Sequence, residues 1–224
     1  MDKFEHIKTN ALLDLSKTIA KDIFADVAYP FEVLPKIKDF ITELSETLDK
    51  SEFDEPIPGV FIHKTATVAK TASISAPCII DAGTEVRHCA FIRGSAVVGK
   101  NCVVGNSVEL KNVIIFDNVQ VPHYNYVGDS VLGYHSHMGA GSITSNVKSD
   151  KTLVKINVDG NVYETGLKKM GAVLGDYVEV GCNSVMNPGT VVGRNTNIYP
   201  LSSVRGFVKS GSIYKNRNEI VEKE

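Results

Sequence analysis

An aliphatic residue returns at every sixth position along most of this chain. The first run of these anchors is Ile62, Val68, Ile74, Ile80, Val86, Ile92, Val98, Val104 and Leu110. After a five-residue step the anchors are Ile115, Val121, Val127, then Leu132, Met138 and Thr144, and a third run is Leu174, Val180, Met186, Val192, Ile198 and Val204. A helix would give a period near 3.6 and a strand a period of 2. A sustained six-residue period fits neither and indicates a solenoid built from short repeats.

A second line of positions supports the same interpretation. The residue two places before each anchor is nearly always Ala, Cys, Ser, Thr or Val. Positions two apart on a strand share a face, so each hexad buries one large and one small side chain. Glycine often follows the anchor, where a sharp corner favours a residue without Cβ. Three hexads would close a triangular coil of about 18 residues, and the anchors suffice for about seven coils.

Residues 1–55 follow a different period. Leu12, Leu15, Ile19 and Ile23 form one stripe, and Leu34, Ile37, Ile41, Leu44 and Leu48 form a second. Steps of three and four residues predict two amphipathic helices. We expect these helices to pack on each other or to cap the solenoid. The alternative is a helix pair that serves oligomerisation or docks a partner.

The chain therefore divides into an N-terminal helical segment (1–55), a solenoid domain (56–205) and a C-terminal tail (206–224). The repeat stops over 147–170, where residues 154–158 and 161–163 flank an Asp159-Gly160 pair and predict a β-hairpin with a two-residue turn. Insertions at solenoid corners often mark the binding face, but the mixed charges of this one also fit a solvated loop. A short strand is expected near 212–214.

Composition excludes several classes of protein. The formal net charge of −2 gives no basic field that would attract nucleic acid. No apolar stretch approaches the roughly 20 residues of a membrane span, and the N-terminus has no apolar signal core. We therefore expect a soluble, cytoplasmic protein with neither nucleic-acid nor membrane partners. Cys78 and Cys102 fall in the small inward position, where a free thiol acts as a small hydrophobe, so neither disulfides nor a zinc site are expected.

The faults in the repeat gather in one place. The two five-residue steps, from Leu110 and from Val127, bracket the segment 122–129. Asn125 puts a polar amide into the small inward position there. A regular sequence that breaks its own rule usually does so at a functional site. His123 in this segment is the natural general base, because its ordinary pKa lies near neutrality. A single histidine at a corner would otherwise be typical of a solvent-facing position.

Two segments of the sequence carry a family resemblance. PHYNYVGDSVLG followed by HMGAGSITSN resembles the acetyltransferase half of the bifunctional glucosamine-1-phosphate acetyltransferase/N-acetylglucosamine-1-phosphate uridylyltransferase, particularly its archaeal relatives. The similarity extends from about Arg93 to Ser202. It implies a mainly β fold, a left-handed parallel β-helix of hexapeptide repeats, which works as a homotrimer with acetyl-CoA as co-substrate. The handedness comes from the resemblance, since the repeat period does not fix it.

The resemblance also implies roles for particular residues. His123 would be the catalytic base and Asn146 would orient the reacting amide region. The predicted substrate-binding residues are Arg93, Lys111, Tyr126, His137, Lys151 and Lys155. An arginine fork together with a lysine suits a phosphate dianion. His137 stands where the family has asparagine, and with His135 it forms an HxH pair for which a shared metal site is a disfavoured alternative.

The acetyl-CoA contacts implied by the resemblance are Ala140, Cys182 and Arg205. Ala140 belongs to a Gly-Ala-Gly loop whose backbone N–H groups would approach the thioester carbonyl. Cys182 stands where the family has serine. Arg205 is a candidate for the CoA 3′-phosphate, because the family's basic C-terminal tail is not recognisable. Acetyl transfer of this kind requires no metal.

The family's other half begins with a glycine-rich loop that cradles nucleotide phosphates, and this sequence contains no such loop. We therefore expect an acetyltransferase that acts on a hexosamine 1-phosphate in UDP-N-acetylhexosamine synthesis, without nucleotidyltransferase activity of its own. One alternative is an acyltransferase on a sugar nucleotide. The other is a non-catalytic trimerisation or regulatory module that partners a separate sugar-phosphate nucleotidyltransferase.

Overall fold

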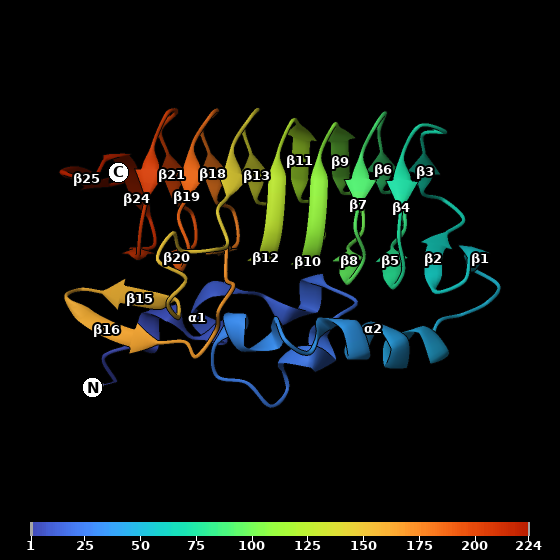
Figure 1. Ribbon diagram of the computed structural model, residues 1–224, viewed down its shortest axis with the longest axis horizontal. Helices are drawn as coiled ribbons and strands as arrows, with labels where there is room; N and C mark the ends of the chain where they lie inside the picture. Colours follow the sequence, from blue (N-terminus) through green and yellow to red (C-terminus); the bar gives the residue numbers. More distant parts are fainter. Residues whose placement is uncertain (1, 224) are drawn as a thin grey trace.

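The computed structural model, described for residues 2–223, is a three-sided parallel β-helix of the left-handed class (Figure 1). Face 1 is formed by β2 (Val60–His63), β5 (Cys78–Ile80), β8 (Ala96–Val98), the second halves of β10 (Glu109–Ile115) and β12 (Tyr126–Leu132), β17 (Ala172–Leu174), β20 (Thr190–Val192) and β23 (Phe207–Val208). These elements stack as parallel neighbours. The predicted solenoid is confirmed.

The other two faces complete each coil. Face 2 consists of β3 (Thr67–Val68), β6 (Glu85–Val86), β9 (Val103–Asn106), β11 (Gln120–His123), β13 (His137–Met138), β18 (Glu179–Val180), β21 (Asn197–Ile198) and β24 (Ser212–Asn216). Face 3 consists of β4 (Ser73–Ile74), β7 (Phe91–Ile92), the first halves of β10 and β12, β14 (Ile143–Thr144), β19 (Val185–Met186) and β22 (Ser203–Val204). Face 3 lies in front of face 2 in Figure 1. We name the edges by the faces that they join.

The five-residue steps shorten two coils. Cys78 pairs with Ala96, 18 residues later, whereas Ala96 pairs with Val113 and Val113 with Ser130, each 17 residues later. At these two coils the chain runs from face 3 into face 1 as the continuous strands β10 and β12. The anchor and the small position of each hexad point inward, and Ile80, Val98, Ile115 and Leu132 are buried. The shortened corners therefore alter one edge and leave the core intact.

The solenoid continues beyond residue 205. β23 pairs with β20 and β24 pairs with β21, so the segment that we expected to be a tail adds strands to faces 1 and 2. Face 1 thereby gains an eighth element, one more than the seven coils that the anchors predict. β25 (Glu219–Glu222) then returns antiparallel to β24, and β1 (Phe53–Ile57) pairs antiparallel with β2 at the other end. The short strand expected near residues 212–214 is confirmed as part of β24.

The first of the two predicted helices is wrong. The stripe from Leu12 to Ile23 is divided among α1 (Thr9–Leu12) and the 3₁₀ turns η2 (Leu15–Lys17) and η3 (Lys21–Phe24), with η1 (Glu5–Ile7) before them. The solenoid competes for the backbone: the N–H of Asp176 donates to Leu12 O at 3.0 Å, and that of Asp117 to Lys17 O at 3.0 Å. A helix this short has little cooperative stability to resist such bonds.

The second predicted helix is confirmed as α2 (Ile37–Glu46), preceded by η4 (Pro30–Val33). The N-terminal segment caps neither end of the solenoid but runs along face 1, as Figure 1 shows in blue, and α2 packs on β5, β8 and β10. The outward residues of the six middle elements of face 1 are consequently aliphatic and fully buried, namely Ile79, Val97, Ile114, Val131, Val173 and Val191. Face 1 is therefore occupied by the chain's own N-terminus.

The insertion forms the predicted hairpin of β15 (Lys155–Val158) and β16 (Asn161–Glu164). Asp159 (φ 49°) and Gly160 (φ 83°) form its turn, and two successive positive φ angles are typical of a type I′ hairpin turn. Tyr163 of the hairpin packs on Tyr29 and Phe31, with ring centroids 4.7 and 5.4 Å away. The hairpin therefore anchors the N-terminal segment.

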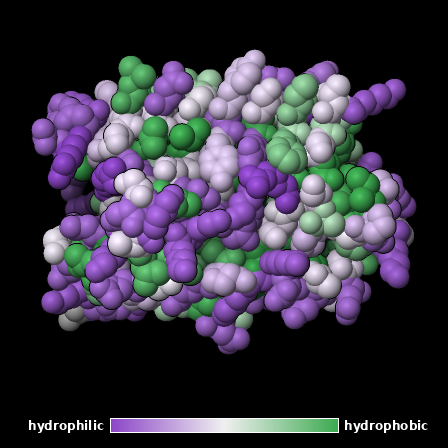
Figure 2. All heavy atoms as spheres, in the orientation of Figure 1, coloured by the Kyte–Doolittle hydropathy of each residue, from purple (hydrophilic) through white to green (hydrophobic). Residues whose placement is uncertain are grey.

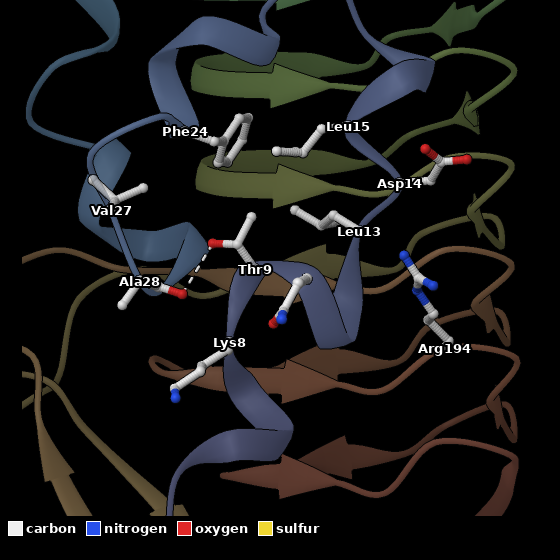
Figure 3. A pocket seen from close by; sticks show the side chains of 10 residues that line it. Lys8, Thr9, Leu13, Asp14, Leu15, Phe24, Val27, Ala28 and Arg194 are labelled. Atoms are coloured by element: carbon white, nitrogen blue, oxygen red, sulfur yellow. Dashed lines mark hydrogen bonds between the residues drawn. The ribbon is translucent and has the colours of Figure 1, made fainter. Parts of the chain in front are cut away.

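The face of the molecule seen in Figure 2 is mostly hydrophilic, and its hydrophobic residues form separate groups. No helix in the described part of the chain is both long and apolar enough to cross a membrane. A hollow of about 570 Å³ is formed mainly by the N-terminal segment and is lined by Lys8, Leu13, Asp14 and Arg194, among others (Figure 3). It contains none of the predicted site residues.

Candidate functional site

His123 lies exposed on the edge between faces 2 and 3, at the end of β11. Backbone hydrogen bonds stack this edge from coil to coil. Gly141 N donates to His123 O at 3.0 Å, and Asn183 N donates to Ala140 O at 2.8 Å. Ala140 therefore follows His123 in the next coil, and Cys182 follows Ala140. The predicted base and two of the three predicted CoA contacts form a continuous line along one edge.

The Gly-Ala-Gly loop offers one free backbone donor. Gly139 N donates to Val180 O at 2.7 Å and Gly141 N donates to His123 O, so both groups serve the stacking of the coils. Within residues 2–223, the N–H of Ala140 has no such partner. The several donors expected from the sequence are thus reduced to the Ala140 N–H, which lies next in line after His123.

The edge between faces 3 and 1 carries a second group of polar residues. Asp129, only 4% exposed, accepts from Lys111 Nζ at 3.0 and 3.1 Å and from Asn112 Nδ2 at 2.9 Å. Asn146 Nδ2 donates to Asp129 and, at 3.2 Å, to Tyr126 Oη. Lys111 and Asn146 therefore share one buried carboxylate, and Tyr126 is joined to it through Asn146.

Tyr126 connects this edge with face 3. Its ring lies toward Gly128, since a Cβ on Gly128 would come within 2.3 Å of Tyr126 Oη. Burial raises the pKa of the Tyr126 phenol above its ordinary value. The hydroxyl therefore stays protonated at neutral pH, where it accepts from Asn146 and keeps its own hydrogen for a ligand.

Arg93 lies on the same edge, 18 residues before Lys111 in the preceding coil. Its guanidinium pairs with Glu109 of β10 at 2.7 Å, and both side chains are partly exposed. Arg93 and Lys111 therefore each have a carboxylate partner. The Arg93 pair is exposed, so a phosphate would compete for that arginine at little cost.

The remaining predicted residues lie outside both the line of His123, Ala140 and Cys182 and the group of residues around Asp129. His137 lies on face 2, with Nδ1 2.9 Å from Glu179. Lys155 belongs to the hairpin and pairs with Glu164 at 2.7 Å, while Lys151 is exposed in the insertion. Arg205 lies on the edge between faces 3 and 1, beside a hollow of about 740 Å³. Within one chain, then, Arg205 is on a different edge from Ala140 and Cys182.

Sequence reasoning missed the part played by Asp129. The residue was visible in the Gly-Asp pair after Tyr126, but nothing in the repeat marked it as a shared acceptor for Lys111 and Asn146. Asn112, which also donates to Leu34 O at 3.1 Å, was missed for the same reason. A carboxylate next to a shortened corner, 18 residues after a lysine, is the signal that could have found the pair.

The cysteines allow an experimental check of the packing inside the solenoid. Cys78 and Cys102 are buried as predicted, and burial raises the pKa of each thiol to about 12. Cys89 and Cys182 are exposed. Because the thiolate is the reactive form, a maleimide should leave Cys78 and Cys102 unlabelled in the native protein and should label all four thiols after denaturation, as counted by mass spectrometry. Labelling of Cys78 or Cys102 in the native protein would contradict the described packing.

Comparisons with known proteins agree with this architecture. The model of the GMPPB C-terminal domain matches residues 74–199, more than half of the chain. "Bifunctional protein GlmU" of Methanococcus maripaludis strain C5 is 32% identical over 198 residues, which is 88% of this chain and 48% of that protein. The "Bifunctional sugar-1-phosphate nucleotidylyltransferase/acetyltransferase" of Sulfurisphaera tokodaii is 31% identical over 193 residues, 85% of this chain and 48% of that protein. The chain spans about half the length of these relatives.

Among solved structures, a mutant of AntD, an N-acyltransferase from Bacillus cereus in complex with dTDP and coenzyme A, matches with a TM-score of 0.37 and 17% identity. That match covers 70% of this chain and 78% of AntD. The assignment rests on the family model, which spans the anchors from Ile74 to Ile198 and includes both edges described above. The chain belongs to the family of the GMPPB C-terminal domain and is similar over most of its length to the GlmU proteins.

Proposed function

We propose that this chain transfers the acetyl group of acetyl-CoA to the amine of a hexosamine 1-phosphate. The observation that carries the proposal is the placement of two groups on the two edges of face 3. His123 and the free Ala140 N–H lie on one edge, and Lys111, Tyr126, Asn146 and Arg93 lie on the other. The similarity to the GlmU and acetyltransferase proteins supports the reaction class.

The geometry suggests how the groups divide the work. Arg93, Lys111 and the Tyr126 hydroxyl would hold the sugar phosphate, with Arg93 leaving Glu109. The amine then faces His123, which takes the proton as the nitrogen attacks the thioester carbonyl carbon. The carbon–sulfur bond breaks, the proton held by His123 passes to the sulfur, and coenzyme A leaves as the thiol. The Ala140 N–H would stabilise the charge that develops on the carbonyl oxygen.

The enclosure of face 1 bears on assembly. Because the N-terminal segment covers that face, only faces 2 and 3 are free to meet a second copy of the chain. Their common edge is the one that carries His123, and Tyr124 and Leu201 on it are 66% and 79% exposed. We propose a homotrimer in which this edge meets a neighbouring chain, so that acetyl-CoA binds between two chains. Arg205, Lys151 and Lys155 would then contribute from the neighbouring chain.

A second candidate function follows from the charge balance of the site. Lys111 is held by Asp129 and Arg93 by Glu109, and these contacts are also what a purely structural edge would have. A non-catalytic module beside a separate nucleotidyltransferase would retain such an edge without turnover.

A thiol-release assay separates these functions. Purified chain is incubated with acetyl-CoA and one acceptor in each of three parallel reactions. The acceptors are glucosamine 1-phosphate, glucosamine 6-phosphate and UDP-glucosamine. Fastest release with the 1-phosphate is the expected result. Fastest release with UDP-glucosamine would transfer the proposal to a sugar-nucleotide acceptor. Background release with every acceptor would refute an acetyltransferase acting on these sugars and favour the non-catalytic module.

Replacing Arg93 with alanine tests the phosphate contact. A lost charge-assisted hydrogen bond costs about 1.5–3 kcal/mol, so KM for the sugar phosphate should rise roughly 10- to 100-fold while kcat changes little. Arg87→Ala is the matched control. Arg87 pairs with Glu85 at 2.8 Å and lies at the end of face 2 that adjoins face 3, away from the edge that carries Arg93. An unchanged KM in Arg93→Ala would remove Arg93 from the site.

A further inference from the structure

One column of inward positions runs along face 3 beside the His123 edge. Its members, one from each coil, are Ala72, Ala90, Val108, Asn125, Ser142, Ser184 and Ser202. Asn125 is the amide in this column, and its side chain is 3% exposed. A buried amide costs free energy unless its donors and acceptor are all paired. Its partners therefore show what it holds in place.

The Asn125 amide joins two consecutive corners of the edge. Its Oδ1 accepts from the backbone N–H of His123 at 3.0 Å. Its Nδ2 donates to Gly139 O at 2.8 Å and to Ser142 O and Oγ at 3.0 and 3.1 Å. Both ends of the amide are thus paired. One end fixes the residue that carries the imidazole, and the other fixes the loop that contains Ala140.

These bonds act where the strand pairing ends. His123 is the last residue of β11, and Tyr124 after it is left-handed (φ 51°), so the chain turns immediately beyond His123. A serine at this position, as in the next coils, would be too short to reach both corners. Ser142 Oγ instead donates to Gly139 O within its own corner, at 2.7 Å. Ser184 Oγ also donates to the next corner, at Tyr199 O (3.0 Å), but within residues 2–223 only the Asn125 side chain in this column also accepts from a backbone N–H of its own corner.

We propose that Asn125 is a positioning residue that sets His123 and the Ala140 N–H relative to each other. The proposal rests on the proposed function, because both groups act there on the same acetyl transfer. The bond between the amine and the carbonyl carbon forms only when base and oxyanion donor are correctly spaced, and small misplacements of such groups cost up to about 100-fold in rate. The loss of Asn125 should therefore affect kcat and leave substrate binding largely intact.

The test compares Asn125→Ser and Asn125→Thr with a matched buried amide. Serine and threonine fill equivalent inward positions, such as Ser142 and Thr190, so at least one variant should fold. Asn187→Ser is the control: Asn187 is 8% exposed and donates to Ser203 Oγ at 3.0 Å and Val204 O at 2.9 Å. The measurements are kcat, KM for both substrates, and hydrogen exchange at the His123 amide.

In either Asn125 variant kcat should fall about 10- to 100-fold, KM should stay within about twofold, and the His123 amide should exchange faster. The control should keep kcat and the exchange rate of the wild type. A folded Asn125 variant with wild-type kcat, or an equal fall of kcat in Asn187→Ser, would overturn the positioning role. Absence of turnover in the wild type would instead refute the proposed function, and this inference with it.

Discussion

Replacing His123 with alanine should lower kcat by about 100- to 10,000-fold, the range typical for removal of a general base. The side chain is exposed at the end of β11 and supports no packing, so the variant should fold and melt like the wild type. KM for the sugar phosphate should change little, because Arg93, Lys111 and Tyr126 remain in place. Initial rates of thiol release and a thermal melt provide both measurements.

His88→Ala is the matched control for this prediction. His88 is exposed on the same edge, two coils before His123, and its carbonyl accepts from Ser107 N at 3.1 Å. It occupies the equivalent corner position two coils earlier, on the side of His123 away from Ala140 and Cys182. Loss of activity in His88→Ala equal to that in His123→Ala would indicate a general effect of the edge rather than base catalysis.

Introducing aspartate at Val97 should destabilise the fold by about 3–5 kcal/mol, as expected for an uncompensated buried charge. Val97 points outward from the solenoid, yet it is fully buried because the N-terminal segment lies on face 1. A loss of this size is a large share of the stability of an ordinary domain. Chemical denaturation of the purified variant measures it, and we expect either a greatly lowered midpoint or insoluble protein.

Val103→Asp is the matched control, since Val103 is the corresponding outward residue on face 2 of the same coil and is only partly buried. Its substitution should cost about 1 kcal/mol or less, as at most surface positions. Equal losses at Val97 and Val103 would contradict the placement of the N-terminal segment on face 1. They would also reopen face 1 as an assembly surface.

The solenoid could be predicted because its physical cause is periodic. Each hexad of every coil requires one large and one small inward side chain, so the same pattern recurs throughout the sequence. The N-terminal segment has no such redundancy. The stripe from Leu12 to Ile23 has helical spacing, but its carbonyls bond to the edge at Asp117 and Asp176. The local sequence does not show that backbone N–H groups of the solenoid compete with a helix for these carbonyls.

Prediction of the site had a similar limit. The two five-residue steps and Asn125 identified the neighbourhood of His123 without a structure, because each departs from a regular pattern. Asp129 departs from no pattern, and its role depends on Lys111 in the preceding coil and Asn146 in the next. Such contacts form between residues of consecutive coils. Which residues meet depends on how the two shortened corners shift the register from one coil to the next.

The central claim is that face 3 binds an amino sugar phosphate between a base on one edge and cations on the other. Its most direct test is identification of the product after incubation of the chain with acetyl-CoA and glucosamine 1-phosphate. We predict that NMR and mass spectrometry will find the amide at the sugar nitrogen, formed by the wild type and not by His123→Ala. Absence of that amide above the His123→Ala background would contradict the account.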